Sequence, residues 1–134
     1  MPHVTIQYTA NLDSEARIHA LCATLAEVIC AQRDDAGQRL YPIGGTRVLA
    51  YPAQAYAVAD GAPDRAFCYV NARIAPGRPR ERVQATGEAI GAAVKTHFAA
   101  IFASRPVGIT VQIDEGAPVF DLKHSNLHPL FAGK

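Results

Sequence analysis

The chain has 134 residues, of which 49% are hydrophobic and 19% charged, with 13 lysines and arginines against 12 aspartates and glutamates. This composition is typical of a globular protein and excludes a disordered or fibrous chain. The formal charge of +1 argues against a nucleic-acid partner, because nucleic-acid binders carry a basic excess. We therefore expect a single domain over residues 1–134.

The sequence contains neither a signal peptide nor an apolar run of membrane-spanning length, so we expect no membrane partner and a cytoplasmic protein with reduced thiols. The three cysteines form no CxxC pair. Cys22 and Cys30 are separated by about 12 Å of rise in a predicted helix, which is too far for a disulfide. We predict that all three cysteines are packing residues.

Residues 2–8 alternate between apolar and polar side chains and are rich in β-branched and aromatic types. This pattern predicts a strand that begins directly after Met1 and holds the chain terminus in a sheet. If Met1 is removed, as a small second residue allows, Pro2 becomes a terminal secondary amine that can accept a proton. The alternative is an incidental proline, since Met-Pro starts are common.

The rest of the first half predicts a helix and a second strand. Asn11 and Asp13 supply a turn and a helix N-cap, and apolar residues spaced by three and four indicate an amphipathic helix over 18–29. A polar segment at 32–38 ends this helix. A strand is then expected from Thr46 to about Val58.

The second half repeats this order. A strand is predicted over 66–75, and a break at 76–79 follows it. Pro79 stands where the first turn of a helix tolerates proline, and an apolar stripe predicts a helix over 83–101. Residues 107–114 alternate again as a strand.

The chain therefore divides into two β-α-β halves, about 1–60 and 61–134, each with a helix of roughly five turns. Such a unit makes its two strands parallel and lays the helix across one face. We predict an α/β (α+β) fold in which a four-stranded mixed sheet carries both helices on one face. The other sheet face is expected to be apolar and uncovered, which predicts an oligomer.

Ten of the cations are arginines, which grip carboxylates bidentately and stay charged. Arg78 lies between a predicted strand and its helix, where its side chain can reach across the end of the sheet. Arg47 heads the second strand. For both, the alternative is an exposed cation at the end of an element, and Arg73, Arg80 and Arg82 are weaker candidates.

The histidines do not predict a metal site. His124 and His128 are four residues apart, but no glutamate stands between them and Pro129 disturbs a helix there. His97 lies beside the apolar stripe of the second helix and is expected in the core or an interface. His3 alternates to the opposite side of the strand from Pro2, so we expect it outside the Pro2 pocket.

The order and spacing of several short motifs resemble the 5-carboxymethyl-2-hydroxymuconate isomerase family of the tautomerase superfamily. The resemblance runs essentially from end to end. The motifs are Met1-Pro2-His3, Tyr41-Pro42-Ile43-Gly44-Gly45-Thr46-Arg47, Ala59-Asp60-Gly61, Gly77-Arg78, Lys95-Thr96-His97-Phe98-Ala99-Ala100 and Asn126-Leu127-His128-Pro129-Leu130-Phe131.

The resemblance implies a homotrimeric enzyme of aromatic catabolism that uses neither a cofactor nor a metal. Its substrate would be a small unsaturated polycarboxylate, a 2-hydroxymuconate-type dienol such as 5-carboxymethyl-2-hydroxymuconate, which it converts to the 2-oxo-3-ene isomer. Pro2 would be the general base and acid, and Arg78 and Arg47 would bind carboxylates. Two alternatives stay open: a hydratase or dehalogenase of the same fold, and a non-enzymatic trimeric protein that binds small acids. The sequence leaves open whether Arg47 acts in its own or a neighbouring subunit's site.

Overall fold

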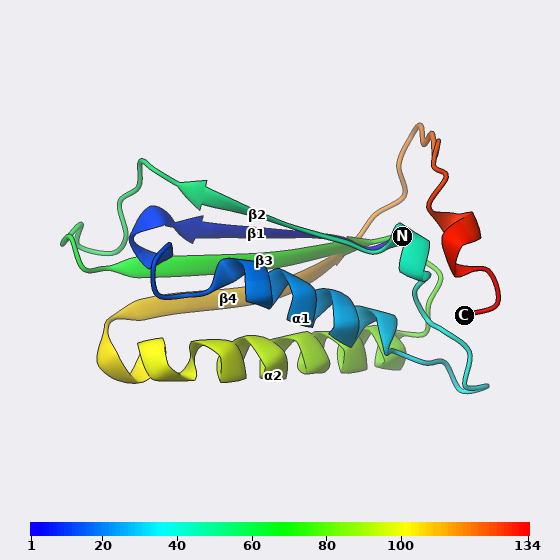
Figure 1. The fold of residues 1–134 in the computed structure, drawn as a ribbon, viewed down its shortest axis with the longest axis horizontal. Helices are drawn as coiled ribbons and strands as arrows, with labels where there is room; N and C mark the ends of the chain where they lie inside the picture. The colour runs from blue at the N-terminus through cyan, green and yellow to red at the C-terminus, as the bar shows by residue number, and fades with distance from the viewer.

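The computed structural model describes residues 1–134 and contains one sheet with two long helices (Figure 1). The elements in chain order are β1 His3–Thr9, η1 Ala10–Leu12, α1 Ile18–Cys30, η2 Ile43–Gly45, β2 Arg47–Ala53, β3 Ala66–Ile74, α2 Arg80–Ser104, β4 Val107–Glu115 and η3 His128–Phe131.

The strand order across the sheet is β2-β1-β3-β4. β1 pairs parallel with β2, β3 pairs parallel with β4, and β1 pairs antiparallel with β3. Both helices lie on the same side of the sheet (Figure 1), with α1 packed on β2 and α2 on β4. The prediction of a four-stranded mixed sheet with two helices on one face is confirmed.

The core lies between the sheet and the helices, and strand alternation explains which residues enter it. Val4 and Ile6 of β1 and Val70 of β3 point toward the helices and are buried. Leu21 of α1 and Phe98 of α2 meet them from the other side, and both are fully buried. Because side chains alternate along a strand, the residues between these positions face away from the helices.

This second face of the sheet is polar at its centre, so the prediction of an apolar uncovered face is wrong there. The Tyr69 hydroxyl donates to Gln112 Oε1 at 2.8 Å, and Asn71 Nδ2 donates to Asp114 Oδ2 at 2.7 Å. On this face of the sheet, the exposed large apolar side chains lie on the edge strand β2, where Leu49 is 53% exposed. Hydrogen bonds between side chains of neighbouring strands thus satisfy the polar groups at the centre of this face, which does not need another apolar surface packed against it.

Three local predictions differ from the structure. Asp13 does not cap α1: it accepts a hydrogen bond from the Tyr8 hydroxyl at 2.5 Å, and Arg17 precedes α1 in a left-handed conformation. β2 ends at Ala53 rather than near Val58, directly after a proline that has no backbone N–H for the ladder. The helices have 13 and 25 residues rather than about five turns each.

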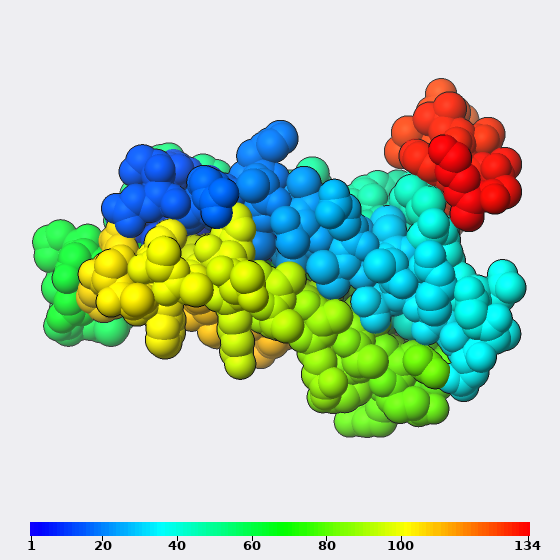
Figure 2. All heavy atoms as spheres, turned by 60° about the horizontal axis from the view of Figure 1, so that its bottom comes forward, coloured from blue at the N-terminus to red at the C-terminus, as the bar shows by residue number.

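The C-terminal segment after β4 projects from the body of the molecule, as Figure 2 shows in red. It leaves β4 at Gly116, passes the N-terminal end of the chain and finishes in η3, which contacts η2. Phe120 and Leu122 in this segment are 81% and 75% exposed. Neither long helix is apolar enough to cross a membrane.

Candidate active site

The N-terminus is held in the sheet at Pro2, the predicted base. The Pro2 side chain is less than 2% exposed, and its carbonyl accepts a hydrogen bond from the Arg47 backbone N–H at 3.2 Å. β1 begins at the next residue, His3. A terminus fixed in this way keeps the Pro2 nitrogen in one place, whereas most chain ends fray.

Met1 occupies the space next to that nitrogen. Its side chain packs against Gly45 so closely that a Cβ at Gly45 would lie 2.7 Å from Met1 Sδ. Met1 also lines a cavity of about 310 Å³ at this end of the sheet. Because the Pro2 nitrogen is bonded to Met1, removal of Met1 would make this nitrogen the chain terminus, next to the space that Met1 occupies in the cavity.

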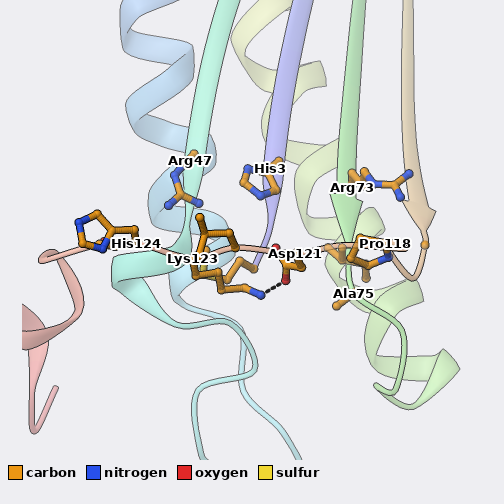
Figure 3. A pocket seen from close by; sticks show the side chains of 13 residues that line it. His3, Arg47, Arg73, Ala75, Pro118, Asp121, Lys123 and His124 are labelled. Carbon is orange, nitrogen blue, oxygen red and sulfur yellow. Dashed lines mark hydrogen bonds and ion pairs between the residues drawn. The ribbon is translucent and has the colours of Figure 1, made fainter.

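The cavity is cationic, and Figure 3 shows how its side chains lie. Arg47, His3 and Arg73 come from three neighbouring strands and stand in one row, because His3 is in register with Arg47 on β2 and with Arg73 on β3. Lys123 and His124 enter from the C-terminal segment. The only acidic lining residue, Asp121, forms an ion pair with Lys123 (Figure 3).

These cations change the protonation of their neighbours. Burial, then Arg78, Lys123 and Arg47 lower the pKa of the Met1 amine, against a smaller opposite effect of Asp121. Burial and Arg47 likewise lower the pKa of His3 below its usual value. Each cation disfavours a further positive charge, so this end of the molecule holds an amine more easily in its neutral form.

The charge of Arg78 lowers the pKa of the Met1 amine, but Arg78 does not line this cavity. It borders a separate groove of about 700 Å³ between α2 and β4. Its Nε donates to the Leu40 carbonyl at 3.0 Å and its Nη1 to the Ala75 carbonyl at 3.1 Å. The guanidinium carbon lies 4.5 Å from the ring centroid of Tyr41, whose buried hydroxyl donates to Thr86 Oγ1 at 3.1 Å. These contacts hold the guanidinium in a fixed orientation.

The structure brings Arg47 together with His3 and Arg73, neither of which was a leading candidate from the sequence. His3 was expected on the opposite side of the strand from Pro2, and the structure agrees, since Pro2 is buried and His3 is exposed. His3 lines the cavity beside Met1 and Arg47, whereas Pro2 is not among the lining residues. Arg73 was a weaker candidate and lines it too. The available signal was strand register: His3 is the first residue of β1 and Arg73 is the second-to-last residue of β3, and the two lie at the same end of the sheet.

Other candidate residues lie elsewhere. Arg82 forms an ion pair with Asp35, and His97 Nε2 contacts the Ala16 carbonyl, between α2 and the segment before α1. Cys68 is fully buried, and burial raises the pKa of its thiol to about 12. A thiol that is so difficult to ionise is a poor nucleophile. This agrees with the prediction that Cys68 is a packing residue.

Solved structures establish the class of protein. The chain superimposes on a crystal structure of a 5-carboxymethyl-2-hydroxymuconate delta-isomerase with a TM-score of 0.93 and 43% identity, over 100% of this chain and 95% of the other. It superimposes on a 5-carboxymethyl-2-hydroxymuconate isomerase from Deinococcus radiodurans R1 with a TM-score of 0.85 and 36% identity, over 97% and 93% of the two chains. A more distant neighbour, a fused 4-OT symmetric trimer at 19% identity, shares the fold with a TM-score of 0.64 over 98% of both chains. The fold is therefore that of a tautomerase-superfamily protein.

Sequence comparison narrows this class. The model of the 5-carboxymethyl-2-hydroxymuconate isomerase family matches residues 2–131. The 5-carboxymethyl-2-hydroxymuconate Delta-isomerase of Escherichia coli is 30% identical over 131 residues, which is 98% of this chain and 99% of that protein. The chain belongs to the 5-carboxymethyl-2-hydroxymuconate isomerase family and is an enzyme of the isomerase class, as the resemblance predicted.

Proposed function

We propose that this enzyme converts a 2-hydroxymuconate-type dienol carboxylate, with 5-carboxymethyl-2-hydroxymuconate as the leading substrate, to its 2-oxo-3-ene isomer, with Pro2 as the base. The observation that carries the proposal is the fixed position of Pro2 beside a cationic cavity that Met1 lines. Removal of Met1 would expose a secondary amine there. The names of its relatives support the substrate class.

In the proposed cycle, the neutral Pro2 nitrogen takes the proton of the substrate's 2-hydroxyl group. The C2–O bond becomes a carbonyl, the C2=C3 and C4=C5 double bonds become one C3=C4 double bond, and C5 receives a proton from the prolyl ammonium. Every proton and electron pair is accounted for without an external reagent. One positioned group can serve both steps, because the prolyl ammonium returns to the neutral amine when it gives its proton to C5.

The arginines would bind the carboxylates and stabilise the dienolate. Arg78 has a fixed guanidinium with Nη2 left over after Nε and Nη1 bond to backbone carbonyls. Such preorganised donors stabilise charge that develops in a transition state. Arg47 lines the same cavity as Met1 of its own chain, and we therefore propose that it acts in its own subunit's site.

An ultraviolet assay of ketonisation tests the proposed reaction. We expect the purified protein to speed the conversion of 2-hydroxymuconate and of its 5-carboxymethyl derivative to their 2-oxo-3-ene isomers. A protein whose mass shows Met1 removed, and which accelerates neither conversion, would contradict the proposal. Binding of the dienols without turnover would favour the non-enzymatic alternative.

The pH dependence of kcat/KM should follow the amine. The neutral amine is the base, so kcat/KM is expected to be low below its pKa and to rise to a plateau above it. Burial and Arg78 lower the pKa of the Met1 amine. We expect the same surroundings to lower the pKa of the Pro2 amine once Met1 is removed, which moves this rise to lower pH. Removing the Arg78 charge in Arg78→Gln should therefore shift the rise to higher pH.

Profiles of kcat/KM from roughly pH 5 to 9, around the ordinary pKa of an α-amine, measure this shift. Lys95→Gln is the matched control, because it removes one positive charge from an exposed position of α2. The pH at which kcat/KM rises should be the same for Lys95→Gln as for the parent. An Arg78→Gln profile that coincides with the parent profile would show that Arg78 does not set the pKa of the base.

We also propose a cytoplasmic homotrimer. A trimeric fold neighbour supports the assembly, and so do the exposed apolar side chains of β2 and of the C-terminal segment. Light scattering of the purified protein measures the mass of the assembly directly, and a monomer would contradict this part of the proposal.

A further inference from the structure

Two arginines in the cavity lack a carboxylate partner. Neither Arg47 nor Arg73 forms an ion pair in the structure. Asp114 is in register with Arg73, but it accepts a hydrogen bond from Asn71 Nδ2 instead. Cations gathered in a cavity without counter-charges repel one another, and an anion that binds between them relieves this repulsion.

The row of side chains has the right dimensions for one carboxylate. Neighbouring strands are about 4.8 Å apart, so the Arg47 and Arg73 backbones flank His3 at roughly 10 Å from each other. Long arginine side chains span such a gap and donate in pairs to a carboxylate. The lowered pKa of His3 leaves its ring neutral near pH 7, with one N–H to donate.

The guanidinium of Arg73 can change its orientation, in contrast to that of Arg78. No hydrogen bond holds its guanidinium, which lies against Gly116 on the β4 side of the cavity (Figure 3). A Cβ at Gly116 would lie 2.4 Å from Arg73 Nη2. The glycine therefore leaves room for the Arg73 side chain at the point where the C-terminal segment begins.

The cavity and the groove that Arg78 borders are separate. Cations of both, Arg78 in the groove and Lys123 and Arg47 in the cavity, lower the pKa of the Met1 amine. We propose that Arg73 and His3, beside Arg47, form a further carboxylate subsite that binds the third carboxylate of a substrate whose other two carboxylates lie at Arg78 and Arg47. This inference rests on the proposed function. It assigns specificity to two residues, while Arg78 and Pro2 serve the chemistry on every substrate.

Binding of two unreactive acids tests the subsite without turnover. We would measure the Kd of propane-1,2,3-tricarboxylate and of glutarate by calorimetry for the parent, Arg73→Gln and Lys95→Gln. Loss of a charge-assisted pair predicts a Kd for the tricarboxylate about 10- to 100-fold higher in Arg73→Gln. The Kd of glutarate should change less than about twofold, and Lys95→Gln should change neither.

Gly116→Ala is a second variant, which leaves the positive charge of Arg73 in place. It pushes the Arg73 guanidinium aside and should weaken tricarboxylate binding in the same direction, while Arg73→Lys, which keeps the charge but loses the fork, should retain part of the affinity. Equal effects of Arg73→Gln on both acids, or no binding of the tricarboxylate by the parent, would overturn the subsite.

Kinetics then separate this inference from the proposed function. Arg73→Gln should raise KM for 5-carboxymethyl-2-hydroxymuconate, which has three carboxylates, far more than for 2-hydroxymuconate, which has two. An active parent enzyme whose Arg73→Gln variant shows no such difference refutes the subsite alone. A parent that binds the tricarboxylate through Arg73 but isomerises neither dienol refutes the proposed function and leaves the subsite standing.

Discussion

Replacement of Pro2 by alanine is expected to lower kcat about 10²-fold, the lower end of what a positioned general base contributes. Alanine in the second position also permits removal of Met1, so the variant keeps a terminal amine. It loses the ring that is buried in the parent and that fixes the nitrogen beside the cavity. A primary amine on a freer chain end spends less time in the reactive position.

Steady-state kinetics on the dienol substrate measure this loss, after intact mass has confirmed that Met1 is absent from both proteins. Thr5→Ala is the matched control, because Thr5 lies on the same strand but does not line the cavity. We expect its kcat within about twofold of the parent. Equal kcat values for Pro2→Ala and the parent would exclude the proline as the base.

The second large effect is expected for Arg78→Gln, which should lower kcat/KM about 10²- to 10³-fold, the cost of removing one preorganised donor from a developing oxyanion. The guanidinium is held by Leu40 and Ala75 carbonyls and by the Tyr41 ring. It therefore needs little reorganisation when the substrate's charge develops. Glutamine removes both the charge and the fork.

Arg78→Lys separates these two contributions. Lysine keeps the charge but cannot reproduce the planar fork or the stacking on Tyr41, so we expect an intermediate kcat/KM. Lys95→Gln again controls for loss of a remote charge. If Arg78→Gln retained the parent's kcat/KM, the contacts of Arg78 would be structural, stabilising the junction between β3 and α2.

Local patterns in the sequence predicted the sheet and the helices well. The alternation in residues 2–8 predicted a strand that starts at the terminus, and the structure begins β1 at His3. The repeated β-α-β order also predicted both parallel strand pairs. These features depend on neighbours in the chain, which a sequence displays directly.

The composition of the site was harder to predict because it depends on register between distant segments. His3, Arg47 and Arg73 share a row only because β1 pairs with both β2 and β3 at particular positions. A shift of one residue would turn Arg73 to the helix side. Lys123 comes from a segment without regular structure, and no periodicity indicates where such a segment passes.

The same reason explains the separation of Arg78 from Arg47. Both were predicted at ends of elements, and the charges of both lower the pKa of the Met1 amine. Sequence position could not show that Arg78 faces the groove beside α2 while Arg47 faces the other side of the sheet. Their roles as carboxylate ligands stay predictions, and the experiments above test each one.

The most direct test of the account follows activity during removal of Met1 from one protein sample. Protein made while methionine aminopeptidase is inhibited keeps Met1, and its Pro2 nitrogen is an amide without basicity. Treatment with purified aminopeptidase, sampled by intact mass and by the ketonisation assay, relates activity to the fraction of free Pro2. We predict that the Met1-containing protein is about 10²- to 10⁴-fold less active and that activity rises in proportion to Met1 removal. Full activity in the protein that retains Met1 would contradict the account.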